Sequence, residues 1–431
     1  MAEPLSAPLS APLSAPLPAP LPLPSRLPRI TGAERRARLV QRHRLAPSLR
    51  VESAEAVAQA LVGLHATDPA TVFLAAAARM QAPTPAAIDR SLYDTGGAAG
   101  GPVLERIRCM RRTMFVVPAD LAPAVQSATT GPAAGRHRTE TAARLHRELG
   151  WDEQRCAAVE RAVLEAIAAR GRATAAQLAA DVPALREQLV VSPGKPYESR
   201  QRAGTPVLGV LAAEGRIRRD RPAGSWTSMQ FHWAPARPLP RLPAAEARAV
   251  LARHYLGAFG PVTVDDMKWW TGWTLTDTRK ALAATAAVAV ALDDSPAPGY
   301  LLPEDLDAPH PAAVEPAAAL LPGLDPTAMG WRHRAWYLDP EHTAELFDRS
   351  GNIGPTVWWN GRIIGSWAQA ADGRIHHHLL TDPGREARAA VEAETARLTA
   401  FLGDTRVTAC YRTPLERHLA ARTGTPATTA P

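Results

Sequence analysis

The chain has 431 residues, of which 46% are hydrophobic, and its formal net charge is +7. At roughly 150 residues per domain, this length predicts two to four domains, and the hydrophobic content is enough to bury real cores. The positive charge favours an anionic partner, such as nucleic acid or an acidic membrane surface, without deciding between them.

The cysteines and the hydropathy indicate the cellular compartment in which the protein works. Cys109, Cys156 and Cys410 are far apart and odd in number, so the sequence implies no disulfide framework and fits a reducing compartment. No apolar run approaches the roughly 18 residues needed to cross a bilayer, so we expect no membrane partner and predict a cytoplasmic protein. Only three of the 49 basic residues are lysine, a bias that fits a GC-rich genome better than selection for bidentate phosphate contacts.

The two ends of the chain have the composition of disordered tails. Residues 1–28 contain a four-residue repeat of proline, leucine, alanine and serine, and proline forbids both helix and strand ladder. This segment has neither the basic start nor the continuous apolar stretch of a signal peptide. Residues 421–431 are also expected to be disordered.

A first globular module is predicted over residues 29–150. Thr31–Leu45 begins with a capping-box pattern, and Val51–Ala66 is a second amphipathic helix. Pro69–Met80 is a third helix, and Arg106–Pro118 ends in a β-branched and aromatic run that is typical of a strand. Helices followed by a strand pair describe a winged helix.

The pattern returns twice. In a second module, residues 151–240, Glu160–Leu189 indicates helix, turn and helix, and Thr205–Asp220 indicates a helix followed by a basic strand. Gln230–Ala236 would be the returning strand. A third copy is predicted over residues 241–295.

These repeats, together with the last third of the chain, set the predicted fold class. Residues 296–420 contain strand-like pieces, a predicted hairpin meander at Pro355–Leu380 and a helix at Pro383–Gly403. We therefore predict an α+β protein with tandem winged-helix modules, each a helix-turn-helix plus a β-wing, and a β-rich C-terminal region. Winged helices usually read duplex DNA, but they also bind proteins, so fold alone leaves both alternatives open.

One short stretch, GLHATDP, contains several polar residues just before the N-terminus of an alanine-rich helix. Asp68 precedes Pro69, a combination that an N-cap explains without any function. His65 and Thr67 point to the same side if this segment is extended, beside a helix N-terminus that attracts negative charge. We predict His65, Thr67 and Asp68 as catalytic residues, with packing and helix capping as the structural alternative.

Basic runs on the two predicted wings are candidate DNA contacts. As phosphate contacts they would make affinity depend on salt, whereas the alternative is a solvated charged face. The paired tryptophans are predicted to pack in the core, and a metal site is not predicted from the His376–His378 run because alternate strand residues face opposite sides. The predicted DNA-binding residues are Arg106, Arg108, Arg111, Arg112, Arg216, Arg218 and Arg219.

With these residues in view, the chain resembles the winged-helix family that includes the AlkZ/YcaQ-type bacterial DNA glycosylases. The resemblance runs from about Arg29 to Gly403 and implies tandem winged helices curved around a DNA-binding concavity. The segments that carry it are Leu61–Ala70, Met110–Thr113, Gly260–Gly272, Leu320–Arg334 and Asn352–Trp367.

The resemblance also implies an activity and a set of positions. Active members release alkylated purines or bulky adducts without a cofactor, using a Gln-apolar-Gln or Gln-apolar-Asp motif that positions water. The two motif positions fall on His65 and Thr67, and the glycine of the family's Arg-Gly-Thr wing falls on Arg112. His65 would accept the proton of the water, Thr67 would orient that water, and Asp68 would supply negative charge.

The expected partner is damaged double-stranded DNA, bound by a monomer associated with the nucleoid. Two alternatives stay open on the sequence alone. One is a winged-helix DNA-binding protein or transcriptional regulator without catalysis, and the other is a module that binds proteins.

Overall fold

The structure is a computed structural model that describes residues 27–94, 102–195, 198–307 and 315–422. The predicted tails lie almost wholly outside these residues. Helices and strands are mixed through the described chain, which agrees with the predicted α+β class. None of the described helices is long and apolar enough to cross a bilayer.

The first folding unit contains the GLHATDP stretch. Its sheet has the order β2-β4-β3, and its helices pack on one face of that sheet. Ser53 and Asp68 accept backbone hydrogen bonds at the starts of α2 and α3. The unit comprises α2 (Ala54–Ala60), β2 (Leu64–His65), α3 (Pro69–Ala77), α4 (Pro85–Tyr93), β3 (Leu104–Arg108) and β4 (Met114–Pro118), and it is preceded by α1 (Gly32–Arg42).

The helix predicted over Val51–Ala66 is wrong at its C-terminal half. Helix α2 ends at Ala60, Val62 has a positive φ of 64°, and the chain then enters strand β2. A Cβ atom on Gly63 would lie 2.8 Å from a Val117 methyl and 2.9 Å from the Val116 carbonyl oxygen. Only a residue without a Cβ atom therefore fits this close to β4. The next residues, Leu64 and His65, pair with β4 as strand β2.

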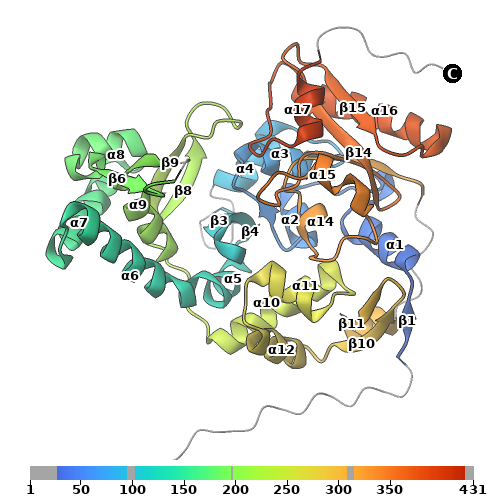
Figure 1. The fold of residues 1–431 in the computed structure, drawn as a ribbon, viewed down its shortest axis with the longest axis horizontal. Coiled ribbons are helices and arrows are strands. Elements are labelled where there is room, and N and C mark those ends of the chain that lie inside the picture. The colour runs from blue at the N-terminus through green and yellow to red at the C-terminus, as the bar shows by residue number, and fades with distance from the viewer. Residues whose placement is uncertain (1–26, 95–101, 196–197, 308–314, 423–431) are drawn as a thin grey trace, which may run out of the picture.

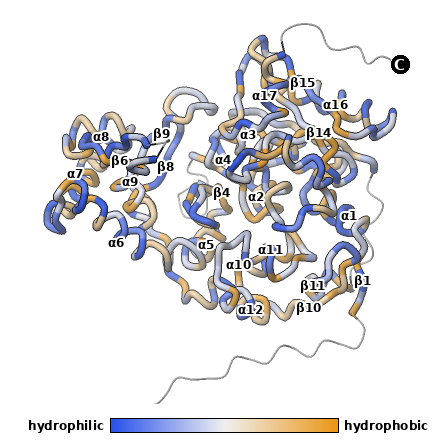
Figure 2. The backbone as a smooth tube through the Cα atoms, in the orientation of Figure 1, coloured by the Kyte–Doolittle hydropathy of each residue, from blue (hydrophilic) through white to orange (hydrophobic). Residues whose placement is uncertain are grey.

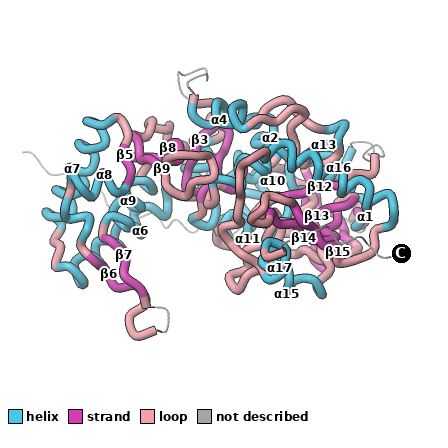
Figure 3. The backbone as a smooth tube through the Cα atoms, turned by 90° about the horizontal axis from the view of Figure 1, so that it is seen from above, coloured by secondary structure: helices cyan, strands magenta, loops and turns pink. Residues whose placement is uncertain are grey.

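Two further units repeat the order of the first. The second has the sheet order β5-β9-β8, which is again first, third, second along the chain. It comprises α7 (Glu153–Arg170), β5 (Ala173–Thr174), α8 (Ala175–Asp181), an inserted hairpin of β6 (Gln188–Val191) and β7 (Ser199–Arg202), α9 (Gly204–Ala213), β8 (Ile217–Pro222) and β9 (Phe231–Pro235). The returning strand predicted at Gln230–Ala236 is confirmed as β9, and the inserted hairpin projects from this unit in Figure 3.

The third unit completes the repeat. It comprises α10 (Ala244–Phe259), α11 (Val264–Thr271), α12 (Leu275–Ala284), β10 (Val288–Leu292) and β11 (Ser295–Leu301). Val262 bridges Tyr300 in the place of a first strand, and β1 (Arg29–Ile30) adds in parallel to β10. Because β11 pairs with β10 up to Leu301, the hairpin crosses the boundary predicted at residue 295.

The C-terminal part is a four-stranded antiparallel meander covered by helices. The hairpin meander predicted at Pro355–Leu380 and the helix predicted at Pro383–Gly403 are confirmed. Its elements, after α13 (Pro303–Asp307), are β12 (Ala318–Leu321), α14 (Pro326–Met329), α15 (Thr343–Leu346), β13 (Thr356–Trp359), β14 (Arg362–Gln369), β15 (Ile375–Leu379), α16 (Gly384–Leu402) and α17 (Pro414–Ala420).

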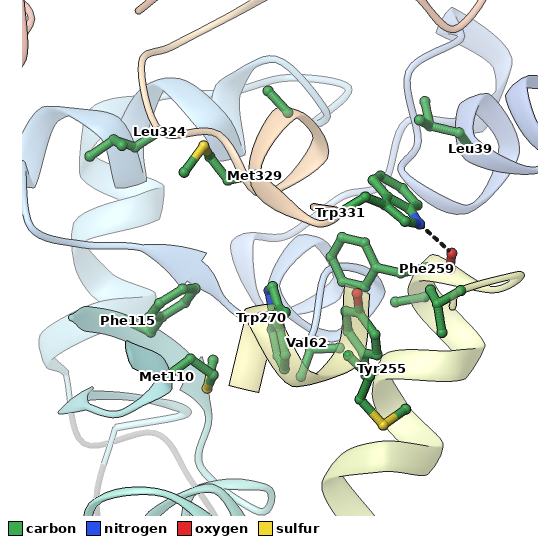
Figure 4. Close-up of a cluster of buried hydrophobic side chains, with 14 of the residues drawn as sticks. Leu39, Val62, Met110, Phe115, Tyr255, Phe259, Trp270, Leu324, Met329 and Trp331 are labelled. Carbon is green, nitrogen blue, oxygen red and sulfur yellow. Dashed lines mark hydrogen bonds between the residues drawn. The ribbon is translucent and has the colours of Figure 1, made fainter. Parts of the chain in front are cut away.

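The first unit, the third unit and the C-terminal sheet share one hydrophobic core. Tyr255 stacks on Trp270 with ring centroids 4.6 Å apart, and Phe259 packs edge-on against Trp331. Figure 4 shows these rings together, and Figure 2 shows hydrophobic and hydrophilic residues interspersed along the elements that surround them. The prediction that paired tryptophans pack in the core is confirmed for Trp270 and Trp358, which are 2% and 1% exposed.

The second unit has a separate core and stands apart as a lobe (Figure 1). Helices α5 (Ala122–Ala128) and α6 (Thr130–Leu149), which the sequence did not predict, connect it to the rest of the chain. Trp273 donates from its indole nitrogen to the Ala128 carbonyl, 2.9 Å away, and so ties this connection to the third unit. The connection between the lobe and the main body is therefore anchored to the third unit.

Candidate functional site

A tight turn between β3 and β4 presents the first group of predicted DNA contacts. Arg111 and Arg112 both have positive φ angles, 51° and 62°. The Cys109 amide donates to the Thr113 carbonyl at 2.8 Å, and the Thr113 hydroxyl donates to the Met110 carbonyl. Left-handed backbone costs a non-glycine residue roughly 1–2 kcal/mol, so this turn is held in a strained conformation.

We expect Arg112→Gly to raise the free energy of unfolding by about 0.5–1 kcal/mol, because glycine adopts the left-handed region without a Cβ penalty. Equilibrium urea unfolding measures this gain. Arg112→Ala is the matched control, since it removes the same guanidinium but keeps the strain. Equal stabilities for the glycine and alanine variants would contradict this explanation.

His65 lies on β2 and is only 4% exposed. Its ring packs edge-on against Phe115 with centroids 5.0 Å apart, and its Nδ1 has no hydrogen-bond partner among the described residues. Burial, and then the charge of Arg111, lower the pKa of His65 from 6.5 to about 3. The ring is therefore neutral at physiological pH, and it is a weak proton acceptor.

Asp68 is also buried, and both of its carboxylate oxygens bind backbone amides. One oxygen accepts from Ala70 at 3.0 Å and caps α3, and the other accepts from Cys410 at 3.1 Å. Burial raises the pKa of Asp68, although both of these hydrogen bonds oppose the shift. The capping interpretation of Asp68 is thus confirmed, and the second bond fixes the segment before α17 against the GLHATDP stretch.

Thr67, unlike His65, lines a large cleft, whereas Asp68 lines a separate and smaller pocket. This cleft, of about 410 Å³, lies between the β3–β4 hairpin of the first unit and α9, β8 and β9 of the second unit. We call it the interlobe cleft. Tyr411, more than three hundred residues along the chain from Thr67, lines the same cleft.

Five of the seven predicted DNA-binding arginines line the interlobe cleft. They are Arg106, Arg108, Arg112, Arg218 and Arg219. Arg219 lies 4.0 Å above the Phe231 ring, and burial, followed by the charges of Arg106 and Arg108, lowers its pKa to about 10. The two basic wings, more than a hundred residues apart in sequence, therefore meet across one cavity.

The other two predicted arginines do not line the interlobe cleft. Arg111 stacks on Trp269 at 3.9 Å, and Arg216 pairs with Glu160 at 2.9 Å. Sequence reasoning also missed residues that the cleft contains, because no local pattern marks them. Among these, Arg237 pairs with the buried Glu105 at 3.1 Å, and Arg218 lies 3.8 Å from the same carboxylate.

A tryptophan of the lobe packs against the main body. Trp226, in the loop between β8 and β9, stacks on Phe73 of α3 with ring centroids 4.9 Å apart. The ring centroids of Trp226 and Phe401, a residue of α16, are 6.0 Å apart. In the same region Arg221 pairs with Asp89 at 2.9 Å.

We expect Trp226→Ala to make amide hydrogen exchange in the β8–β9 loop about 2- to 10-fold faster, because such aromatic pairs contribute about 0.5–1.5 kcal/mol. Hydrogen-exchange mass spectrometry measures this change. The matched control is Met229→Ala, since Met229 lies in the same loop and is 51% exposed. Equal rates for both variants would show that the stacking does not hold the loop.

No group of three or more histidine, cysteine or acidic side chains placed to hold a metal occurs among the described residues. The side chains that line the interlobe cleft include six arginines, four threonines, Tyr411 and the carboxylate of Glu105, which pairs with Arg237. No lysine is among the residues that line it, so its wall provides no amine to attack a sugar carbon. This set of side chains suits an anionic polymer and attack by water.

Comparisons with known proteins show the family to which the chain belongs. A family model described as DNA glycosylase AlkZ-like matches residues 58–401. The chain belongs to the AlkZ-like DNA glycosylase family. The match spans the GLHATDP stretch, both arginine-rich wings and the meander, so the resemblance drawn from the sequence is confirmed.

Individual AlkZ-like relatives give the fold and a partial sequence match. The Interstrand DNA cross-link repair glycosylase of Streptomyces sahachiroi is 26% identical over 166 residues, 38% of this chain and 44% of that protein. The matched part is therefore less than half of that relative. The solved structure of Streptomyces sahachiroi DNA glycosylase AlkZ has a TM-score of 0.65 and 20% identity, covering 88% of this chain and 99% of that one. At this identity the similarity establishes a shared fold.

Proposed function

We propose that this AlkZ-like protein is a monomeric DNA glycosylase that binds damaged double-stranded DNA in the interlobe cleft. The single observation that carries the proposal is the cleft itself, which Thr67 of the family motif lines together with six arginines. Guanidinium groups bind phosphate oxygens in bidentate fashion, and the motif residue then lies beside the bound strand.

The repeated units support the same proposal. Each has a helix–strand–helix–helix–strand–strand order, with the isolated Val262 bridge standing for the first strand of the third unit. We assign these units as winged-helix modules, the first two over residues 29–150 and 151–240 and the third from residue 241 to Leu301, where its hairpin ends, followed by the β-rich region up to residue 420. The β3–β4 and β8–β9 hairpins are then the wings, and both contribute to the interlobe cleft.

The proposed reaction is hydrolysis of the N-glycosidic bond of an alkylated or bulky-adduct base. Thr67 orients a water molecule near the sugar carbon. Neutral His65, two residues earlier on the same segment, accepts the proton of that water, a step that requires DNA binding to uncover the ring, because His65 is buried and does not line the interlobe cleft. Asp68, fixed by the Ala70 and Cys410 amides, contributes negative charge near the developing cation. Because burial lowers the pKa of His65, proton acceptance is the most demanding part of this scheme.

A second candidate function is DNA binding without catalysis, as in a regulator. The burial of His65 and the occupation of both Asp68 oxygens by backbone amides favour it. A regulator of this class is usually a dimer that reads a palindrome, so a monomer that binds one duplex favours repair. Light scattering of the protein, with and without DNA, separates these states.

Base release from defined duplexes tests the proposal. Duplexes that carry a methylated purine or a bulky alkylated purine are incubated with the protein, and abasic sites are detected as strand breaks after hot alkali. The proposed glycosylase produces breaks only after alkali, because water rather than an amine attacks the sugar. Tight duplex binding without abasic sites on either substrate would leave the non-catalytic candidate.

A further inference from the structure

A second basic cleft lies on the other side of the β3–β4 turn. Its volume is about 350 Å³, and its walls come from that turn, the junction of α5 and α6, and the segment between α11 and α12. It shares Arg108 and Arg112 with the interlobe cleft, so the turn stands between two cavities that both contain arginine. We call it the flanking cleft.

The charge in the flanking cleft is poorly balanced. Five arginines line it, against the single carboxylate of Asp277. Asp277 is already bound, by Arg248 at 2.8 Å and by the Thr274 hydroxyl at 2.8 Å. The remaining four arginines have no carboxylate within ion-pair distance among the described residues, and they are Arg108, Arg111, Arg112 and Arg136.

The protein itself satisfies little of the hydrogen-bonding capacity of these side chains. Arg108 donates from Nε to the Arg112 carbonyl at 2.9 Å, and Arg111 stacks on Trp269 with its buried Nε unpaired. Arg136 is exposed on α6, and no hydrogen bond or ion pair joins its guanidinium to another described residue. Each guanidinium carries five N–H donors, so the flanking cleft presents many donors and few acceptors.

His137 lies in the same cleft beside these arginines. Burial, followed by the charges of Arg108 and Arg112, lowers its pKa, so the ring is neutral at pH 7 and is not part of the positive charge. Its Nε2 is buried and has no hydrogen-bond partner in the described chain. A neutral ring with a free nitrogen can still contribute one hydrogen bond.

We propose that the flanking cleft binds the phosphodiester backbone of duplex DNA beside the lesion, with Arg136 of α6 as a phosphate contact. Clustered guanidinium groups without carboxylate partners repel one another, and an anion with several oxygens relieves that repulsion. The continuity of the two clefts through Arg108 and Arg112 favours a polymer that passes over the turn rather than a free anion. This proposal rests on the DNA-binding part of the proposed function and assigns a role to the opposite side of the turn.

The test is the salt dependence of binding to an undamaged duplex. For Arg136→Ala we expect affinity about 5- to 10-fold lower near 0.1 M salt, and a slope of log affinity against log salt that is shallower by about 0.9. Fluorescence anisotropy with a labelled duplex of about 20 base pairs, titrated from 50 to 200 mM salt, gives both numbers. The matched control is Arg147→Ala, on the same helix, where Arg147 is 70% exposed and far from the flanking cleft.

The outcomes separate this proposal from the proposed function. If wild-type protein binds the duplex and Arg136→Ala leaves the slope unchanged, the flanking cleft is not a DNA site, while glycosylase activity is unaffected. If wild-type protein does not bind DNA at all, both proposals fail. Binding of inorganic phosphate that Arg136→Ala abolishes, with an unchanged DNA slope, would make the cleft a small-anion site and overturn the assignment.

Discussion

Replacing Arg79 with methionine is expected to lower the free energy of unfolding by about 3–5 kcal/mol, the cost of breaking a buried ion pair by removing one partner. Arg79 and Asp325 are both 0% exposed, and two guanidinium nitrogens donate to the two carboxylate oxygens at 2.9 and 2.7 Å. Methionine leaves the Asp325 carboxylate buried without its cation. Equilibrium urea unfolding measures the loss.

The Arg79 side chain also joins three parts of the molecule. It donates to the His43 carbonyl at 2.9 Å and to the Thr327 hydroxyl at 2.8 Å, while the His43 ring lies 3.1 Å from the Ala258 carbonyl. The first unit, the third unit and the C-terminal region therefore meet at one buried polar network. Its loss should weaken their docking as well as local packing.

Two further variants make the Arg79 prediction specific. Arg253→Met removes an ion pair with Glu304 in which the side chains are 56% and 53% exposed, and it should cost at most about 1 kcal/mol. Adding Asp325→Leu to Arg79→Met should restore part of the loss, because it removes the uncompensated charge. A cost below about 1 kcal/mol for Arg79→Met would contradict the assignment of this network as the junction.

Local signals in the sequence predicted helix starts well. Thr31 and Asp68 accept backbone hydrogen bonds at the N-termini of α1 and α3, as the capping-box pattern at Thr31 and the Asp68-Pro69 combination indicated. A cap depends on residues within one turn, so the sequence contains the information. The hairpins of the meander were predictable for the same reason, because two-residue turn signals are local.

The candidate site was only partly predictable because its walls are distant in sequence. The GLHATDP pattern marked His65, Thr67 and Asp68, but only tertiary contacts make their environments different. Phe115 covers His65, the Cys410 amide binds Asp68, and α9 faces Thr67 across the interlobe cleft. No window of sequence around residue 65 contains those partners, so burial and exposure could not be assigned before the fold was known.

The second large effect is a loss of base release, expected when His65 of the GLHATDP stretch is replaced. His65→Ala should reduce the rate of base release by roughly 10²- to 10⁴-fold, the usual contribution of a positioned proton acceptor. Duplex affinity should stay close to that of wild type, because His65 does not line the interlobe cleft and the arginines that line it are unchanged. Single-turnover base release and anisotropy measure the two quantities separately.

A matched control exists for the loss of a buried imidazole. His376, on β15, is 8% exposed and also has a ring nitrogen without a partner among the described residues. His376→Ala should therefore cost comparable packing while leaving base release unchanged. Thr67→Val, which keeps the shape of the side chain but removes the hydroxyl, should lower base release in the same direction as His65→Ala.

The pH dependence of base release decides in which state His65 acts. Because burial lowers its folded pKa to about 3, the ring stays neutral as pH falls from 8 to 5, and no loss of rate centred near pH 6.5 is expected. An acidic limb near 6.5 that disappears in His65→Ala would mean that DNA binding restores the ordinary pKa of the ring. If His65→Ala releases an alkylated base as fast as wild type, the imidazole has no part in the reaction, and Thr67 is the motif position left to orient water.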